Sequence, residues 1–159
     1  MNKTYLLLGS NMGNSKAMLS KAVRLIKKQI GVITRQSDLY ATAAWGNTKQ
    51  PDFLNQIIIV ETTLSAHQTM QTILSIEKKM GRVRTIKNAP RIIDIDILFF
   101  NKEIIEEAKL SVPHLQIQNR RFVLIPLNQL SPNLRHPVLK KSVHQLLIHC
   151  PDKLNVKKF

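Results

Sequence analysis

Two aspartates, Asp94 and Asp96, stand one residue apart in an otherwise apolar stretch that spans residues 92–100. In a β-strand their side chains would point to the same face, roughly 6 to 7 Å apart along the chain, and their charges would repel each other. Carboxylate oxygens are the ligands that Mg²⁺ takes when it also binds phosphates. The spacing therefore predicts a metal site on one face of a strand. The apolar residues expected to pack on its other face are Ile93, Ile95, Ile97 and Phe99.

A basic segment, residues 82–91, comes directly before the two aspartates, and it contains Arg82, Arg84, Lys87 and Arg91. Phosphate transfer from a nucleotide is catalysed mostly by positioning and charge neutralisation, for which guanidinium groups suit the phosphate oxygens. A plainer interpretation is an edge strand with two solvated carboxylates after a solvated basic loop. The scarcity of acids, 10 against 24 Lys and Arg, favours a site for a magnesium-bound nucleoside triphosphate.

A third set of residues has the chemistry to hold a flat ligand. Thr42, Trp45, Phe53 and Asn55 combine polar edges with aromatic faces in a chain that is only 5% aromatic. Such a set predicts a planar, hydrogen-bonding heterocycle held by stacking and edge recognition, although the two aromatic residues would serve equally as ordinary core. Of the histidines, only His114 has a suggestive position, where it would bond a phosphate or a backbone carbonyl.

The composition predicts one domain over residues 1–159, since this length and a hydrophobic content of 43% are enough for one core. No window is apolar over the roughly 18 residues that a membrane helix needs, and the amino terminus does not resemble a signal peptide, so a cytosolic protein is expected. Cys150 is the only cysteine, which excludes an internal disulfide. The net charge of +14 favours nucleic acid, acidic lipid or a phosphorylated small molecule, without choosing among them.

The elements that must position these residues follow from periodicity. Apolar and β-branched runs predict strands at residues 5–8, 32–40, 53–63 and 92–100, with loops at 41–51 and 82–91. One helix is expected before Gly31, a second between Ser65, which has Gln68 three positions later, and Gly81, and a short third at residues 143–148. The order strand, helix, strand, strand, helix, strand predicts an α/β (α+β) sandwich with a ferredoxin-like βαββαβ core and a mostly antiparallel sheet.

Segments spread in order over nearly the whole chain resemble one enzyme family. They are Leu8-Gly9-Ser10-Asn11, Pro51-Asp52-Phe53-Leu54-Asn55, Glu77 with Gly81-Arg82-Val83-Arg84, Pro90-Arg91-Ile92-Ile93-Asp94-Ile95-Asp96-Ile97, and Val112-Pro113-His114 with Asn119-Arg120-Arg121-Phe122. Together they resemble the 6-hydroxymethyl-7,8-dihydropterin pyrophosphokinase (HPPK) family of folate biosynthesis. The resemblance implies transfer of pyrophosphate from ATP to the hydroxymethyl group of a reduced pterin, with release of AMP.

The resemblance also implies residue roles. Asp94 and Asp96 would hold two Mg²⁺ ions that bridge the ATP phosphates, and Asp96 is a candidate proton acceptor. The catalytic residues would be Arg82, Arg91, Asp94 and Asp96. The ATP site would comprise Glu77, Arg82, Arg84, Arg91, Ile97, Ser111, His114 and Arg120. The pterin would lie between Phe53 and Phe122, with its edge read by Thr42, Asn55 and the backbone around Ala43 and Trp45.

Some positions depart from the family's usual pattern, namely Ala43-Ala44 in place of prolines, Trp45 in place of an aliphatic residue, and Leu74 in place of a frequent glutamine.

The order of elements and a pI near 10.3 also fit an RNA-recognition module, but the glycine and aromatic code of that module is missing. An inactive structural relative is a third interpretation. The partners expected are ATP and a reduced pterin, bound by a monomer that takes neither nucleic acid nor membrane.

Overall fold

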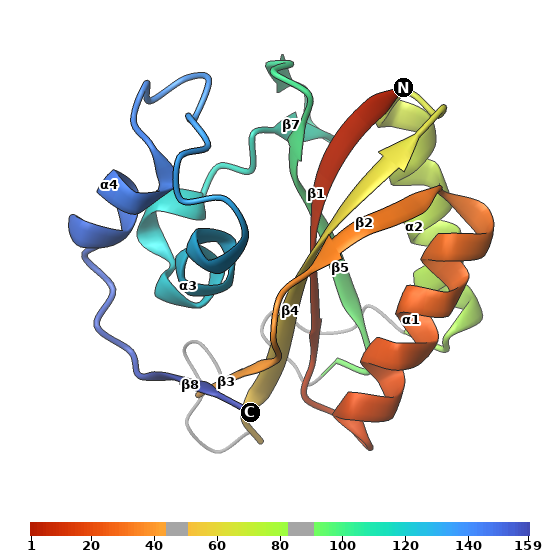
Figure 1. Cartoon of the computed structure of the whole chain (residues 1–159). Helices are drawn as coiled ribbons and strands as arrows, with labels where there is room; N and C mark the ends of the chain where they lie inside the picture. Colours follow the sequence, from red (N-terminus) through yellow and green to blue (C-terminus); the bar gives the residue numbers. More distant parts are fainter. Residues whose placement is uncertain (44–50, 83–90) are drawn as a thin grey trace.

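The computed structural model describes residues 1–43, 51–82 and 91–159. A central antiparallel sheet has the strand order β5-β1-β4-β3-β8, and β2 also pairs with β4 (Figure 1). Its strands are β1 (Asn2–Ser10), β2 (Val32–Gln36), β3 (Tyr40–Thr42), β4 (Phe53–Thr62), β5 (Asp94–Phe100) and β8 (Val156–Lys158). The short strands β6 (Ile105–Glu106) and β7 (Ser111–Val112) form a separate pair.

Helices cover both faces of this sheet, which gives three layers (Figure 1). Helices α1 (Ser15–Gln29) and α2 (Ala66–Lys79) lie on one face, and α3 (Arg121–Leu130) and α4 (Val143–Ile148) lie on the other, with the 3₁₀ turn η1 (Ile117–Asn119) before α3. The side chains of neighbouring strand residues point to opposite faces of the sheet. Leu6 therefore packs in the core on the α1 and α2 side, and Leu7 packs in the core on the α3 and α4 side. The predicted α+β sandwich is confirmed.

Local signals in the sequence account for the ends of the helices. The Asn14 side chain accepts a hydrogen bond from the backbone of Ala17 at the start of α1. Ser65 and Gln68 form the predicted capping box at the start of α2, and Gly81 follows that helix with a φ of 90°. No helix within residues 1–43, 51–82 and 91–159 is long and apolar enough to cross a bilayer.

Strand β5 contains an irregularity that the sequence pattern does not reveal. Tyr5 of β1 pairs with Phe99, but the next residue, Leu6, pairs with Ile97, so β5 has one extra residue at Leu98. Such a bulge reverses the alternation of side chains beyond it. Phe99 therefore packs against α3 and α4, on the opposite side to Ile93, Ile95 and Ile97. The prediction that all four share one face is wrong for Phe99.

Three other segments differ from the predicted elements. The strand expected over residues 32–40 is divided into β2 and β3, and β3 extends to Thr42, inside the expected loop. Ser37 lies between the two strands and remains attached to β4, since its amide donates to the Ile57 carbonyl and its hydroxyl accepts from the Ile57 amide. Helix α3, which contains Pro126, and strand β8 were both absent from the predicted elements.

Candidate active site

A cavity of about 230 Å³ opens where β1, β3, β4 and β5 meet the start of α3. It brings the carboxylate pair together with Thr42, Phe53, Asn55 and Phe122 of the predicted pterin-binding residues, although Thr42 and Phe122 are 80 positions apart in the chain. The described residues that line it are Leu7, Gly9, Thr42, Ala43, Phe53, Asn55, Arg91, Asp94, Asp96, Arg120 and Phe122. The two predicted groups therefore form one site.

The register of the sheet explains why these residues meet. Gly9 on the central strand β1 pairs with Asn55 of β4 on one side and with Asp94 of β5 on the other. Two residues earlier, Leu7 pairs with Asp96. A Cβ atom on Gly9 would lie 2.7 Å from Oδ1 of Asn55, closer than real Cβ contacts allow. A glycine is therefore required here for the amide of Asn55 to keep its position.

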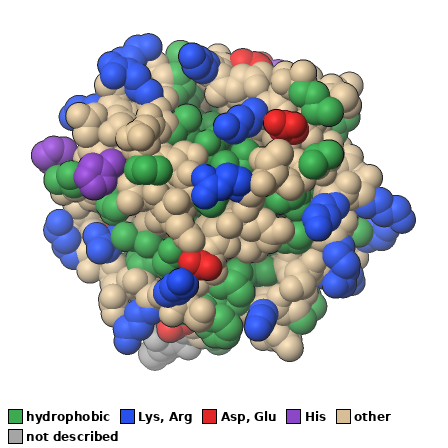
Figure 2. All heavy atoms as spheres, viewed as in Figure 1, with side chains coloured by type: hydrophobic (Ala, Val, Ile, Leu, Met, Phe, Trp, Pro, Cys, Tyr) green, Lys and Arg blue, Asp and Glu red, His purple; other side chains and the backbone are tan. Residues whose placement is uncertain are grey.

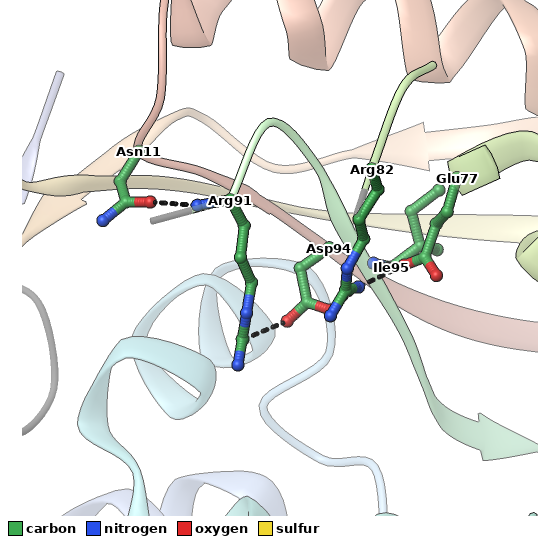
Figure 3. A network of polar contacts seen from close by, with 6 residues as sticks. All are labelled: Asn11, Glu77, Arg82, Arg91, Asp94 and Ile95. Carbon is green, nitrogen blue, oxygen red and sulfur yellow. Dashed lines mark hydrogen bonds and ion pairs between the residues drawn. The ribbon is translucent and has the colours of Figure 1, made fainter. Parts of the chain in front are cut away.

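The first aspartate of the pair is held by two arginines (Figure 3). Nη1 of Arg82 lies 2.5 Å from Oδ1 of Asp94 and 2.8 Å from Oε2 of Glu77, and Nη1 of Arg91 lies 3.1 Å from Oδ2 of Asp94. The Arg82 side chain is only 8% exposed. Burial acts to lower the pKa of Arg82, but the charges of Asp94 and Glu77 outweigh it and raise that pKa overall.

Glu77 lies behind the carboxylate pair and not among the residues that line the cavity. Its side chain is 3% exposed, and its Oε2 also accepts a hydrogen bond of 2.8 Å from the backbone amide of Ile95. Ile95 stands between the two aspartates on β5, which is an edge strand of the sheet. Glu77 thus supplies the acceptor that a neighbouring strand would otherwise provide, and it holds in place the part of β5 that carries Asp94 and Asp96.

Asp96 has a different electrostatic environment from Asp94. Among the described residues no ion pair reaches it, and burial together with the nearby charges of Asp94 and Glu77 raises its pKa to about 7. A buried carboxylate without an ion-pair partner, close to two other carboxylates, is suited to bind a cation. No group of three or more metal-ligating side chains occurs in the described ranges, so a Mg²⁺ ion here would complete its coordination with phosphate oxygens and water, as nucleotide-bound Mg²⁺ commonly does. The residues present fit such an ion.

The other end of the cavity combines aromatic faces with buried amides and hydroxyls. Phe53 and Phe122 both line it, and the guanidinium of Arg120 lies 5.7 Å from the centre of the Phe122 ring. Asn55 and Thr42 are each 3% exposed, and Nδ2 of Asn55 donates to Oγ1 of Thr42 over 3.3 Å. Buried polar atoms facing a cavity between two aromatic residues suit a flat, polar heterocycle.

Asn11 is a site residue whose role the sequence did not disclose. Its Oδ1 accepts from the backbone amide of Arg91 at 2.8 Å (Figure 3). Its own backbone amide donates to the Arg91 carbonyl at 3.1 Å, and its Nδ2 donates to the Pro51 carbonyl at 3.2 Å. Pro51 and Arg91 are the first described residues after 44–50 and 83–90. Asn11 therefore fixes the chain near the cavity in two places, at Pro51 and at Arg91. Its only signal in the sequence was its place in the segment Leu8-Gly9-Ser10-Asn11.

Other predicted residues lie outside the cavity. Ile97 is 3% exposed in the core beneath α1 and α2, and the Ser111 hydroxyl donates to the Glu107 carbonyl over 3.4 Å. His114 accepts a hydrogen bond from the Gln116 amide through Nδ1, and burial, followed by the charge of Arg120, lowers its pKa. Trp45, Arg84 and Lys87 fall outside the described residues.

On the face shown in Figure 2, the basic residues do not form one patch. Lysine and arginine side chains are spread over this face, with few acidic side chains between them. Arg82 and Arg91 are engaged with the carboxylates of the site.

Comparison with known proteins defines the class of this fold and site. The sequence matches the family 7,8-dihydro-6-hydroxymethylpterin-pyrophosphokinase (HPPK) over residues 5–132. It is 40% identical over 136 residues to the 2-amino-4-hydroxy-6-hydroxymethyldihydropteridine pyrophosphokinase of Methylorubrum extorquens, covering 84% of this chain and 85% of that protein. The enzyme of the same name from Aquifex aeolicus is 35% identical over 145 residues, covering 91% and 90%. The chain belongs to the HPPK family.

Longer proteins contain a similar part. A folic acid synthesis protein of Schizosaccharomyces pombe is 39% identical over 151 residues, which cover 94% of this chain and 20% of that protein. The crystal structure of Plasmodium falciparum HPPK-DHPS, wild type with pteroate, superposes with a TM-score of 0.77 at 20% sequence identity, covering 92% of this chain and 44% of that one. At this identity the likeness supports the fold alone, and it confirms the arrangement described above.

Proposed function

We propose that this chain is a 2-amino-4-hydroxy-6-hydroxymethyldihydropteridine diphosphokinase, which transfers pyrophosphate from ATP to 6-hydroxymethyl-7,8-dihydropterin in folate biosynthesis. Membership of the HPPK family supports this function. The single observation that carries it from the structure is the cavity, in which a carboxylate pair with arginines adjoins two phenylalanines and a buried amide. One end suits the phosphates of a nucleotide and the other suits a pterin ring.

The pterin end would bind by shape and by hydrogen bonds. Phe53 and Phe122 would stack on the two faces of the ring, while Asn55, Thr42 and the backbone at Ala43 would pair with its edge. The amide of Asn55 can present both an acceptor and donors to a heterocycle that has both. Because Asn55 is already held by Thr42, little conformational freedom would be lost when the ring binds.

At the other end, Asp94 and Asp96 would hold Mg²⁺ together with the ATP phosphates. The ion would supply positive charge that polarises the phosphoryl oxygens and offsets the charge that develops on the leaving group. Arg82, Arg91 and Arg120 would add fixed positive charge around the phosphates. Arg82 is well suited to this, because Glu77 fixes its guanidinium from behind.

The reaction would proceed by in-line displacement. The hydroxymethyl oxygen would form a bond to the β-phosphorus, and the bond from that phosphorus to the oxygen shared with the α-phosphate would break, so that AMP leaves with that oxygen. The hydroxyl proton must depart as the new bond forms. Asp96 is the candidate acceptor, since its carboxylate has no ion-pair partner among the described residues and lines the same cavity as the pterin-binding residues.

The test is AMP formation from ATP and 6-hydroxymethyl-7,8-dihydropterin, with and without Mg²⁺. The native chain should release AMP only with Mg²⁺, and Asp96→Ala should lower the rate by roughly a hundredfold or more. Glu61→Ala, which removes an exposed carboxylate of β4 outside the cavity, should retain the native rate. Release of ADP would place the attack at the γ-phosphorus, and a native chain without turnover would contradict the proposed function.

The proposal also covers the domain organisation, the oligomeric state and the cellular location of the enzyme. We infer that residues 1–159 act as one domain, as a monomer and in the cytosol. The support is that the two cores lie on opposite faces of one sheet and that Cys150 is a buried free thiol.

A further inference from the structure

The cavity has two walls that come from distant parts of the chain. Thr42 and Ala43 belong to one wall, at the end of β3, and Arg120 and Phe122 belong to the other, at the start of α3. Residues 152–159 make contacts with the backbone of both walls, and they lie beyond residue 132, where the match to the HPPK family ends. We propose that residues 152–159 are a clasp that fixes the separation of the two walls and so positions the pterin-binding residues. This inference rests on the function proposed above.

The first anchor of the clasp is Asp152. Its side chain is largely buried, with the residue 8% exposed, and Oδ2 accepts a hydrogen bond of 3.0 Å from the backbone amide of Arg121. Arg121 lies between Arg120 and Phe122, whose side chains line the cavity. Helix α3 has no side-chain cap from its own N-cap residue, so Asp152 supplies both an acceptor and a negative charge at the positive end of the helix dipole.

The second anchor is strand β8, which the chain reaches after α4 and which lies beside β3 (Figure 1). Val156 pairs with Thr42, and the amide of Phe159 donates to the Leu39 carbonyl at 2.8 Å. Strand β3 is only three residues long, and without β8 its backbone would pair with β4 alone. Its side-chain link to α3 among the described residues is the hydrogen bond of 2.8 Å from the Tyr40 hydroxyl to Oε1 of Gln129, which lies far from the start of that helix.

A displacement of β3 would act directly on the predicted pterin site. On its other side, β3 pairs Thr42 with Phe53 and Tyr40 with Asn55. The hydroxyl of Thr42 also accepts the hydrogen bond from Asn55 that sets the orientation of the amide. The carboxylates on β5 are separated from β3 by β4 and β1, so they should be much less affected.

The geometry of the pairing provides a matched pair of variants. The N–H groups along an antiparallel strand point alternately toward and away from the neighbouring strand. The amide of Phe159 donates to the Leu39 carbonyl, directly before β3, so the amide of Lys157, two residues earlier, also faces β3, whereas that of Val156 faces away. Lys157→Pro therefore removes a hydrogen bond of the clasp, and Val156→Pro places the same ring in the same strand without removing one.

The experiment measures two dissociation constants for the native chain and each variant, one for a non-hydrolysable ATP analogue with Mg²⁺ and one for 6-hydroxymethyl-7,8-dihydropterin with that analogue present. Lys157→Pro should weaken pterin binding roughly tenfold, as expected for one lost hydrogen bond. Its affinity for the analogue should change by less than about twofold, and Val156→Pro should resemble the native chain for both ligands.

A second variant tests the other anchor. Asp152→Asn keeps the shape of the side chain but removes its charge and one of the two oxygens that accept the amides of Arg121 and Leu154. It should weaken pterin binding by about threefold with unchanged binding of the analogue. Equal effects of the two prolines, native pterin binding in Lys157→Pro, or equal loss of both ligands would each overturn the clasp. Failure of the native chain to bind the pterin is a different result, because it would overturn the proposed function.

Discussion

The two aspartates of the site should have opposite effects on the stability of the ligand-free protein. Burial and the charges of Asp94 and Glu77 raise the pKa of Asp96 from 3.8 to about 7, so the folded state disfavours its charged form. The contribution of Asp96 to stability is greatest below pH 3.8 and is lost as the pH rises toward 7. Asparagine resembles the protonated acid at every pH, so Asp96→Asn should stabilise the protein in neutral or alkaline buffer.

The size of this effect follows from the shift in pKa. A difference of about three units corresponds to about 4 kcal/mol at pH 8, and the same relation leaves about 2 kcal/mol at pH 5. Asp94→Asn should do the reverse. It removes the charged partner of Arg82 and Arg91, of which Arg82 is nearly buried, and should lower the free energy of unfolding by about 1 to 3 kcal/mol.

The assay is urea unfolding of the native chain and both variants in EDTA, at pH 5 and pH 8. Asp96→Asn should be more stable than the native chain at pH 8, by a margin that shrinks at pH 5. Addition of Mg²⁺ with an ATP analogue should stabilise the native chain much more than Asp96→Asn, because the ligands bind only the folded state. If Asp96→Asn were less stable than the native chain at pH 8 in EDTA, the electrostatic reasoning would be refuted.

Substitutions at two further positions, Glu77 and Gly9, test how the site is held. Glu77→Ala leaves the Ile95 amide and part of Arg82 without their buried acceptor, and it should lower the free energy of unfolding by about 2 to 4 kcal/mol. Glu77→Gln keeps an acceptor and should lower the free energy of unfolding by about half as much. Equal stability of both variants and the native chain in urea would contradict this role of Glu77. Gly9→Ala would displace Asn55 and should weaken pterin binding, measured by titration, roughly tenfold. Binding of the ATP analogue is the control. Unchanged pterin binding would show that the Asn55 amide tolerates the displacement.

The features predicted correctly from the sequence are those that depend on near neighbours in the chain. The Ser65 and Gln68 capping box and the stop at Gly81 are signals within a few residues, and both appear in the structure. The shared face of Asp94 and Asp96 follows from the alternation of a single strand. The bulge at Leu98 and the pairing of β8 with β3 were not predicted, because each depends on a partner strand far away in the sequence.

The role of Glu77 shows the same limit within the site itself. From the sequence, Glu77 is an acidic residue on a helix, and the family resemblance places it near the nucleotide. Its contact with the Ile95 amide, 18 positions away, exists because α2 packs against the edge strand β5. A residue that completes the hydrogen bonds of a strand edge leaves no periodic pattern, so only the assembled structure can distinguish it from a residue that contacts the ligand.

The electrostatics of the site follow from how its charges are arranged. Three carboxylates, Asp94, Asp96 and Glu77, lie close together, and the described arginines that bond to them engage only Asp94 and Glu77. A third cation beside Asp96 would stabilise the protein but would compete with the ion that the reaction needs. The Asp96 charge that destabilises the ligand-free fold is therefore the same charge that would bind Mg²⁺. Any substitution that neutralises Asp96 should raise stability and lower activity.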